Sequence, residues 1–366
     1  MTWETVPFNR AFVDVTRQSP KVKQREFASA GRFPVVDQGV DDVAGFWDDP
    51  ADVTRVARPL VLFGDHTRRV KYATSDFVMG ADGVKALAPC PQLEPRFAFW
   101  WLSALSIPSA GYSRHFKFLQ DRHVPIPQLA EQRRIAAILD EADQLRTRAT
   151  DRLRRMDEGA RAAVAEIVGD APTSCPLGSL IGEPLRNGIS PSKSGSIVAD
   201  VLTLSAITRG DFDARARKTD TFASLHAPDK VVRKGLHLIC RGNGNPELVG
   251  TMAVVTSDLD GVAFPDTMIA MRPSSEISSS ALDAAWRSRF VRDQIGRGAR
   301  TTNGTYKINQ QLLAAIQVPV GSPAQQEQIG AIEELRARLS SDLASAIRSS
   351  DALFASLQHR AFRGEL

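Results

Sequence analysis

The sequence predicts a mixed α/β (α+β) fold, in which two β-rich domains occur in tandem and are separated by two long helices. Three observations support this prediction: the chain repeats itself, two segments carry apolar residues at helical spacing, and short apolar runs broken by turn residues precede each segment. The chain has 366 residues, of which 43% are hydrophobic and 24% are charged. This composition is typical of globular proteins and excludes a mostly disordered chain.

The internal repeat is the strongest pattern in the sequence. At a shift of 194 residues, segment 118–138 falls on segment 312–332, and both segments carry a Val-Pro pair at the same place. Further identities in the first segment include Ala130, Gln132, Ile135, Ala137 and Ile138. A shift of 184 residues lays Asp82 on Asp266. Because insertions in loops change the shift in this way, each half is predicted to be a mixed domain followed by a helix.

The two long helices are marked by their periodicity and by their caps. Apolar residues recur at a mean step near 3.5–3.6 over 135–167 and 329–357, which is typical of amphipathic helices with a coiled-coil seam. Before the second helix Ser322 is suited to cap, Pro323 to the first helical position and Gln325 to a capping box. Each helix is predicted to run about 40 residues, or about 60 Å. Since neither has enough apolar face to be buried alone, we expect them to pack antiparallel on each other as a spacer.

The mixed domains are predicted to contain short strands separated by Gly, Pro, Asp and Asn. The strand candidates are 33–36, 60–63, 77–79, 198–205, 236–240, 251–256 and 268–271, and the helix candidates are 96–105 and 279–295. The predicted domains are 1–123, 124–170, 171–317 and 318–366. Trp100, Trp101 and Trp286 lie in apolar helical segments, so we expect them to anchor the core.

Several catalytic patterns are absent from the sequence. It contains no G-x-x-x-x-G-K-[ST] phosphate loop, no G-x-S-x-G turn, no [DE]-x-K pair and no [DN]-P-P-[FY] turn of the kind that amino-methyltransferases need. The six histidines and three cysteines have no spacing typical of a metal site, so none is predicted. The odd cysteine count, the lack of a signal-like N-terminus and the lack of an apolar run long enough for a membrane span favour a cytoplasmic protein. A catalytic role is therefore not expected.

Three stretches of sequence resemble one known family. PQLAEQRRIAAILDEAD after Val124-Pro125, LFGDHTRRVKY with DFVMGADGVKAL in the first half, and DTMIAMRP with GTYKINQQLLAAIQVPV in the second half are similar to segments of the specificity (S) subunits of type I restriction–modification systems. The resemblance covers essentially the whole chain. At the second helix entry, Val-Pro-Val-Gly-Ser-Pro replaces the family's usual alternating prolines, which leaves the angle of that helix open.

The resemblance implies a function in phage defence. S subunits are non-catalytic DNA-binding proteins in which each of two target recognition domains reads one half of a bipartite double-stranded site. Their paired helices form a coiled-coil spacer and dock two methyltransferase (M) subunits, which bring S-adenosylmethionine and methylate adenine. Restriction/translocase (R) subunits can join them. No cofactor is expected in this chain itself.

Reading DNA requires Lys and Arg at phosphates and Arg, Asn, Gln or Lys at base edges. In the first domain the predicted DNA-binding residues are Lys21, Lys23, Arg25, His66, Arg68, Arg69 and Lys71. In the second domain they are Arg186, Lys193, Arg209, Arg241, Asn243, Asn245, Arg297, Arg300, Thr301, Thr302, Asn303 and Lys307. The stretch 296–307 is the best single candidate, because it is basic, rich in glycine and free of acidic residues.

The first turns of the two long helices are candidates for partner binding. The residues are Glu131, Gln132, Arg133, Arg134, Gln325, Gln326, Glu327 and Gln328. Polar residues at these places also suit a solvated first turn, and the sequence leaves both interpretations open. An alternative function for the whole chain is a non-catalytic repeat adaptor that binds protein rather than DNA. The net charge of only +4 does not decide between the two functions.

Overall fold

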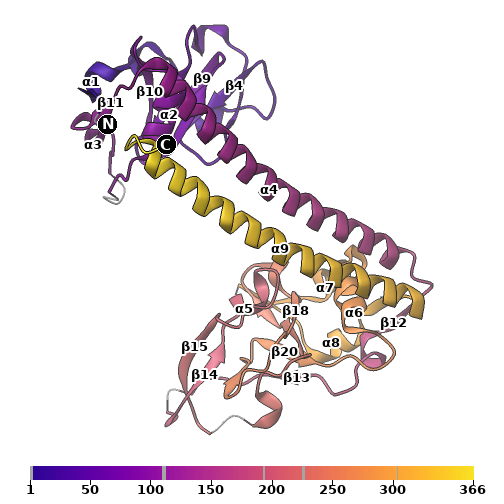
Figure 1. The fold of residues 1–366 in the computed structure, drawn as a ribbon. Coiled ribbons are helices and arrows are strands. Elements are labelled where there is room, and N and C mark those ends of the chain that lie inside the picture. The colour runs from indigo at the N-terminus through magenta and orange to yellow at the C-terminus, as the bar shows by residue number, and fades with distance from the viewer. Residues whose placement is uncertain (1–2, 109–112, 193, 225–226, 303) are drawn as a thin grey trace. The chain divides into compact units, whose positions relative to one another are not determined.

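The computed structural model confirms the mixed α/β fold class and describes residues 3–108, 113–192, 194–224, 227–302 and 304–366 (Figure 1). The chain divides into two compact units. Unit 1 comprises Met1–Asp151 and Leu343–Leu366, and unit 2 comprises Arg152–Asp342. Each unit therefore contains one β-rich domain and parts of both long helices.

Unit 1 is built around a four-stranded sheet of order β2-β10-β7-β8 and a second sheet of order β3-β9-β4-β5, in which β6 pairs with β9. Strands β1 and β11 form a separate pair. The helices of its β-rich domain are α1 (Phe8–Ala11), α2 (Pro95–Ala104) and α3 (Lys117–Gln120). The strands are β1 (Thr5–Pro7), β2 (Phe12–Asp14), β3 (Lys21–Lys23), β4 (Phe33–Val36), β5 (Gly45–Trp47), β6 (Val53–Thr54), β7 (Leu60–Gly64), β8 (Val70–Ala73), β9 (Phe77–Ala81), β10 (Val84–Pro89) and β11 (His123–Pro125).

Unit 2 has a four-stranded sheet of order β13-β20-β16-β18, two three-stranded sheets of orders β15-β14-β19 and β17-β22-β21, and the pair β12-β23. Its helices are α5 (Ser205–Thr208), α6 (Ser279–Arg287), α7 (Arg289–Gly298) and α8 (Gln310–Ala315). The strands are β12 (Thr173–Pro176), β13 (Arg186–Asn187), β14 (Ile197–Leu202), β15 (Arg217–Phe222), β16 (His237–Cys240), β17 (Gly242–Asn243), β18 (Met252–Val254), β19 (Val262–Ala263), β20 (Met268–Met271), β21 (Arg300–Thr302), β22 (Thr305–Lys307) and β23 (Gln317–Val320).

The structure confirms the internal repeat at the level of strand register. Gly64 at the end of β7 pairs with Val84 of β10, and Cys240 at the end of β16 pairs with Met268 of β20. Val84 and Met268 are 184 positions apart, which is the shift found in the sequence. The main sheets of the two units therefore have matching strand order and register, although few of their residues are identical.

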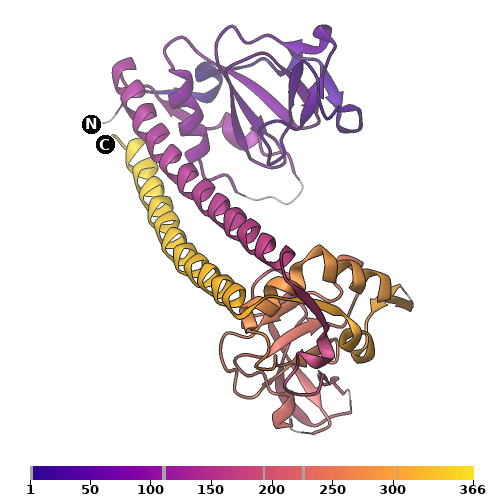
Figure 2. The ribbon, with the colours of Figure 1, turned by 90° about the vertical axis from the view of Figure 1, so that its right-hand side faces the viewer.

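The two long helices are α4 (Leu129–Gly169, 41 residues) and α9 (Pro323–Ala361, 39 residues). The predicted capping box of α9 is confirmed, because the Ser322 hydroxyl accepts from the Gln325 N–H at 3.3 Å and the Gln325 side chain accepts from the Ser322 N–H at 2.9 Å. These reciprocal bonds satisfy backbone donors that a helix start leaves unpaired. Figure 2 shows both helices along their lengths.

Within each unit, the segments of α4 and α9 run antiparallel. In unit 1, Arg134 near the start of α4 donates to the Leu366 carbonyl at 2.9 Å, and Arg146 lies 3.8 Å from Asp351. In unit 2, Arg336 donates to Asp157 at 2.9 Å, while Gln325 donates to the Asp170 carbonyl at 3.3 Å. The predicted packing of the helices on each other is therefore present in both units.

Helix α2 contributes side chains to the core of unit 1, and helix α6 contributes side chains to the core of unit 2. Trp100 and Trp101 are 4% exposed and Trp286 is 1% exposed, so the prediction that they anchor the core is confirmed. Trp100 and Phe354 of α9 contact edge to face at 5.4 Å between ring centroids. Phe97 contacts Phe362 in the same manner, also at 5.4 Å. The C-terminal segment thus closes the core of unit 1.

Two predicted elements differ from the structure. The helix expected over 279–295 is two helices, α6 and α7, because Ser288 leaves the helical conformation and its hydroxyl accepts from the Val291 N–H at 3.4 Å to cap α7. The strand expected over 198–205 ends at Leu202, because residue 205 already begins α5. In the described residues, no helix is long and apolar enough to cross a membrane.

Candidate nucleic-acid interface

Some of the predicted DNA-binding residues of the two domains fall on equivalent loops. The loop after β7 begins with Asp65, whose N–H donates to the Gly83 carbonyl at 2.6 Å and whose carbonyl accepts from His115 at 2.8 Å. The loop after β16 begins with Arg241, whose N–H donates to the Thr267 carbonyl at 2.8 Å and whose carbonyl accepts from the Ile308 N–H at 2.9 Å. The set His66, Arg68, Arg69 and the set Arg241, Asn243, Asn245 therefore start from the same framework position in the two units.

In unit 1 the loop after β7 is held by Gln38, a residue that the sequence analysis did not select. The Gln38 side chain accepts from the His66 N–H at 3.1 Å and donates to the Asp82 carbonyl at 2.9 Å. Its backbone carbonyl accepts from the Thr67 hydroxyl at 2.8 Å. Gly83, at φ +88°, leaves no room for a Cβ beside the Gln38 amide. A lone glutamine after a strand carries no sequence signal of this role.

Two of the basic residues in this region serve the fold. Arg68, which has φ +61°, donates to the Ile107 carbonyl at 3.0 Å. The Lys71 side chain is 10% exposed, donates to the Asp41 carbonyl at 2.5 Å and lies 3.7 Å from Asp37. Burial lowers the pKa of Lys71, and nearby Asp37 opposes that shift. The amine of half-buried Lys71 is thus engaged with acceptors of the chain itself, and its contact with DNA stays a prediction.

The other predicted lysines and arginines of unit 1 are exposed, as Arg68 also is. Arg69 is exposed at the end of the loop after β7. Lys21 and Lys23 are exposed on either side of buried Val22 in β3, as strand alternation requires. Arg25 is also exposed and lies 3.6 Å from Glu26. Their contact with DNA stays a prediction.

In unit 2 the sheet β17-β22-β21 joins two groups of predicted residues. Asn243 pairs with Tyr306, which pairs with Thr301, while Lys307 pairs with both Arg300 and Gly242. Tyr306 packs against the hydrophobic core of unit 2. Because successive side chains of a strand point to opposite faces, Arg300 and Lys307 share the other face, and both are exposed.

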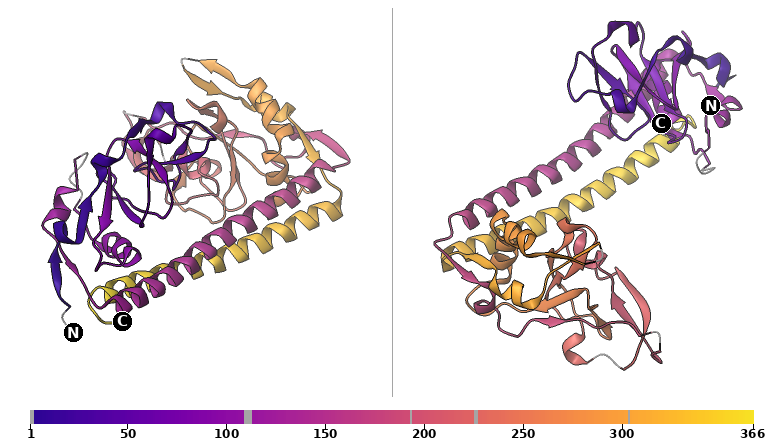
Figure 3. Two further views of the ribbon diagram at one scale, coloured as in Figure 1. Left: turned by 90° about the horizontal axis from the view of Figure 1, so that it is seen from above. Right: turned by 180° about the vertical axis from the view of Figure 1, so that it is seen from behind.

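The hairpin β21–β22 projects from the rest of unit 2 (Figure 3). Lys193 and Asn303 lie outside the described residues, and Thr302 is described only as part of β21. Arg297 is not in this sheet but in α7, where it is exposed and donates to the Asp293 carbonyl at 3.1 Å. The predicted stretch 296–307 is thus divided between a helix end and a hairpin.

Other predicted residues of unit 2 have structural partners. Arg186 pairs with Glu183 at 2.5 Å, its side chain is 21% exposed and its Nε is buried, and its contact with DNA stays a prediction. Arg241 is half-buried and donates to the Asp266 carbonyl at 3.2 Å. The side-chain oxygens of Asn243 and Asn245 accept from backbone N–H groups two residues ahead, at 2.9 and 3.0 Å. Arg209 is exposed.

The candidate partner-binding residues also divide into some that hold the fold and others that lie near the surface. Gln132 is fully buried, and its amide donates to the carbonyls of Gln92 and Pro127 at 2.9 and 2.8 Å. Its assignment as a partner contact is therefore corrected. Gln326 is half-buried and donates to the carbonyls of Glu276 and Gly321, both at 3.1 Å.

The other residues of these first turns remain near the surface. Glu131 accepts two bonds of 2.8 Å from Arg134, and these bonds hold the pKa of Glu131 below its usual range. Gln325 belongs to the capping box of α9. Partner binding stays a prediction for the exposed residues Arg133, Arg134, Glu327 and Gln328.

No metal centre is found in the part of the chain that the structure describes, where no group of three or more His, Cys, Asp or Glu is placed to hold an ion. The cysteines Cys90, Cys175 and Cys240 are free thiols. Burial raises the pKa of the Cys240 thiol to about 11. This thiol is therefore unsuited to act as a nucleophile near neutral pH.

Comparison with solved structures shows which fold this is. The crystal structure of the type I restriction–modification system S subunit from M. genitalium matches 99% of this chain and 96% of its own, with a TM-score of 0.56 and 15% identity. A chain from a structure described as the "structural basis underlying complex assembly and conformational transition of the type I R-M system" matches 100% of this chain and 98% of its own, with a TM-score of 0.59 and 15% identity. No protein-family model and no curated protein matches the sequence. The chain thus has the fold of type I S subunits.

Proposed function

We propose that this chain is the non-catalytic DNA-recognition subunit of a type I restriction–modification system. Each unit reads one half of a bipartite double-stranded DNA site. The observation that carries the proposal is the pair of equivalent loops after β7 and β16, which place basic and amide side chains at the same framework position of two repeated domains. The fold shared with S subunits over the whole chain supports it.

Exposed cations beside these loops provide the electrostatic part of DNA binding. Arg69 in unit 1, with Arg300 and Lys307 in unit 2, can reach a phosphate or a guanine edge without breaking an interaction that holds the fold. Arg68, Lys71 and Arg186 also hold interactions within the fold, and their contact with DNA remains part of the proposal. Sequence specificity would then come from the two loops, and affinity from the cations around them.

The remaining parts of the proposal concern assembly. Helices α4 and α9 set the spacing between the half-sites and dock two methyltransferase subunits, which supply S-adenosylmethionine and methylate adenine. Restriction/translocase subunits can complete the complex. Exposed Arg133, Arg134, Glu327 and Gln328 at the two helix starts are the proposed docking residues.

A domain exchange tests the proposed function directly. Residues 1–123 are replaced by the recognition domain of another S subunit, and methylated adenines are mapped in DNA exposed to the chain with its methyltransferase. One half-site should change and the other should remain. A simultaneous change of both half-sites, or methyl transfer by the chain without a partner, would contradict the proposal.

A salt titration distinguishes DNA recognition from the alternative of a protein-binding adaptor. Each phosphate contact releases counterions, so the logarithm of the DNA affinity should fall steeply with the logarithm of the salt concentration. An adaptor would show no saturable binding to a DNA duplex that carries the mapped site.

A further inference from the structure

Unit 2 contains a cavity of about 800 Å³ that the proposed function does not use. Its apolar wall is formed by Val164 and Val168 of α4, Ala284 of α6, Phe290 of α7 and Pro319 of β23. Pockets of this size with mostly apolar walls and a few polar groups are typical of small-molecule sites. Phe290 is 52% exposed, so its aromatic ring is accessible at the cavity.

The repeat explains why the cavity exists in unit 2. At the shift of 184 residues Ala284 of α6 corresponds to Trp100 of α2, and at the shift of 194 residues Ala160 of α4 corresponds to Phe354 of α9. In unit 1 these two rings contact each other and fill the space between the helices. Unit 2 has alanine at both positions, and Ala284 lines the cavity.

Helix α7 adds a second feature that is peculiar to unit 2. The shift of the repeat grows from 184 to 194 residues between α6 and β23, and α7, which lies there, has 10 residues. Arg289 and Phe290 at the start of this insertion line the cavity. The cavity is therefore formed both by an alanine in place of a tryptophan and by an inserted helix.

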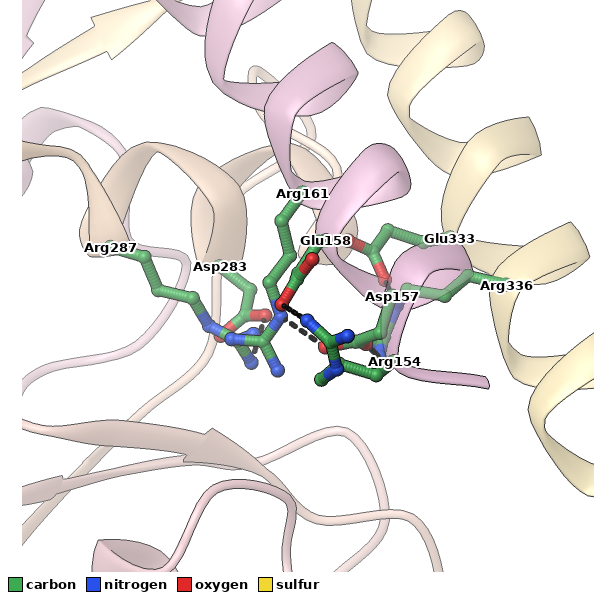
Figure 4. A network of polar contacts seen from close by, with 8 residues as sticks. All are labelled: Arg154, Asp157, Glu158, Arg161, Asp283, Arg287, Glu333 and Arg336. Carbon is green, nitrogen blue, oxygen red and sulfur yellow. Dashed lines mark hydrogen bonds and ion pairs between the residues drawn. The ribbon is translucent and has the colours of Figure 1, made fainter. Parts of the chain in front are cut away.

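The rim of the cavity is rich in guanidinium groups (Figure 4). Arg161 of α4 pairs with Asp157 at 2.7 Å, and Arg287 of α6 pairs with Asp283 at 2.8 Å. Arg289 is 94% exposed. A guanidinium has five N–H donors, so one ion pair leaves donors for a second anion.

Each of these arginines has an acidic partner, because Arg289 also lies 3.7 Å from Asp293. The lining contains Asp283 and Glu333 against three arginines, and Glu333 already accepts from Arg336 at 2.7 Å. Unit 1 shows how arginines and rings combine in the equivalent place, since Arg96 lies 5.1 Å from the Trp100 ring centroid and Arg146 lies 4.7 Å from that of Phe354.

We propose that this cavity binds a small aromatic molecule that carries a carboxylate or phosphate group. Its ring occupies the volume that the Trp100 side chain fills in unit 1, and its anionic group meets Arg161 and Arg287. The ring contributes burial of apolar surface, and the arginines contribute charge-assisted hydrogen bonds that orient it. A molecule bound in this cavity contacts the C-terminal end of α4 and helices α6 and α7.

The test uses indole-3-propionate as the probe and the full chain as the receptor, with isothermal titration calorimetry. Indole, which lacks the carboxylate, should bind about tenfold more weakly than indole-3-propionate. Arg287→Met should weaken the binding of indole-3-propionate by a similar factor and leave the binding of indole unchanged. Ala284→Trp restores the side chain found in unit 1 and should abolish binding of both probes. Ala162→Trp, at an exposed position of α4 that does not line the cavity, is the matched control and should bind like the wild type.

The outcomes separate clearly. Failure of the wild type to bind indole-3-propionate at millimolar concentration, or unchanged binding by Ala284→Trp, would overturn the proposal. Circular dichroism and thermal unfolding verify that each variant is folded, and Ala284→Leu replaces Ala284→Trp if the larger side chain prevents folding. DNA binding by the wild type is measured separately, so the result does not depend on the proposed function.

Discussion

The side-chain oxygen of Gln132 accepts a hydrogen bond of 2.7 Å from the backbone N–H of Glu94, the residue that caps α2. In unit 2 the side-chain oxygen of Gln326 accepts a bond of the same length from the N–H of Ser278, which caps α6. A glutamine at equivalent positions of the repeat thus links the first turn of each long helix to the N-cap residue of α2 or α6.

Gln132→Ala should lower the free energy of unfolding by about 2–3 kcal/mol, because it leaves one buried N–H and two carbonyls without their partner. Gln326→Ala should cost less, since Gln326 is only half-buried. Urea denaturation measures both. Gln328→Ala, on the exposed side of α9, is the control and should change stability by less than about 0.5 kcal/mol. Equal stability of Gln132→Ala and the control would contradict the role assigned to this bond.

Arg68 and Arg69 are adjacent in sequence, but alanine substitution of Arg68 should affect stability, whereas that of Arg69 should affect DNA binding. Arg69→Ala should reduce the slope of log affinity against log salt by about 0.9 in DNA binding and leave stability unchanged. Arg68→Ala should lose about 1 kcal/mol of stability, because the Ile107 carbonyl loses its donor. Fluorescence anisotropy over a range of salt concentrations and urea denaturation separate the two effects. The assignment fails if both variants lose DNA affinity with equal salt dependence.

Trp100→Ala should cost about 3–5 kcal/mol in the free energy of unfolding, as expected for removal of a buried aromatic ring. The variant also deprives Asp140 of a 2.8 Å bond from the indole N–H. Leu145→Ala is a control on the same unit, since Leu145 is 51% exposed. A loss of less than about 1 kcal/mol for Trp100→Ala would mean that α2 repacks against α4 and α9.

Asp283 should make stability depend on pH. Burial raises its pKa to about 6, while Arg287 and Arg336 oppose this shift and Glu333 and Asp211 add to it. An unfolded aspartate titrates near pH 4, so between about pH 4 and about pH 6 the folded chain holds a proton that the unfolded chain has lost. The resulting stabilisation is fully present below about pH 4 and is lost as the pH rises through about 6, with a slope approaching about 1.4 kcal/mol per pH unit.

Asp283→Asn removes this titration. Urea denaturation of the wild type and the variant from about pH 4 to about pH 7 should show that the difference between their unfolding free energies changes over that range and becomes constant above it. A constant difference at every pH would show that Asp283 titrates normally in the folded chain.

Sequence patterns predicted the parts of the fold that depend on periodicity and repetition. The capping residues Ser322 and Gln325 and the shift that joins Val84 to Met268 could be found because they leave local or repeated signals. The interactions of Lys71 with Asp41 and Asp37 could not be found in this way, because its partners are distant residues that sequence spacing does not identify. Gln38 escaped selection for the same reason, since its partners His66 and Asp82 are far along the chain.

The composition of unit 1 has a consequence for the order of events during synthesis. Its core includes Phe354 of α9, and Phe362 packs against that core, whereas unit 2 lies within one continuous stretch that ends at Asp342. We therefore expect unit 2 to complete its fold first, although it follows the first domain in sequence. Until α9 emerges, Phe97 and Trp100 lack their aromatic partners, so the first domain depends on a segment far along the chain to cover an apolar surface.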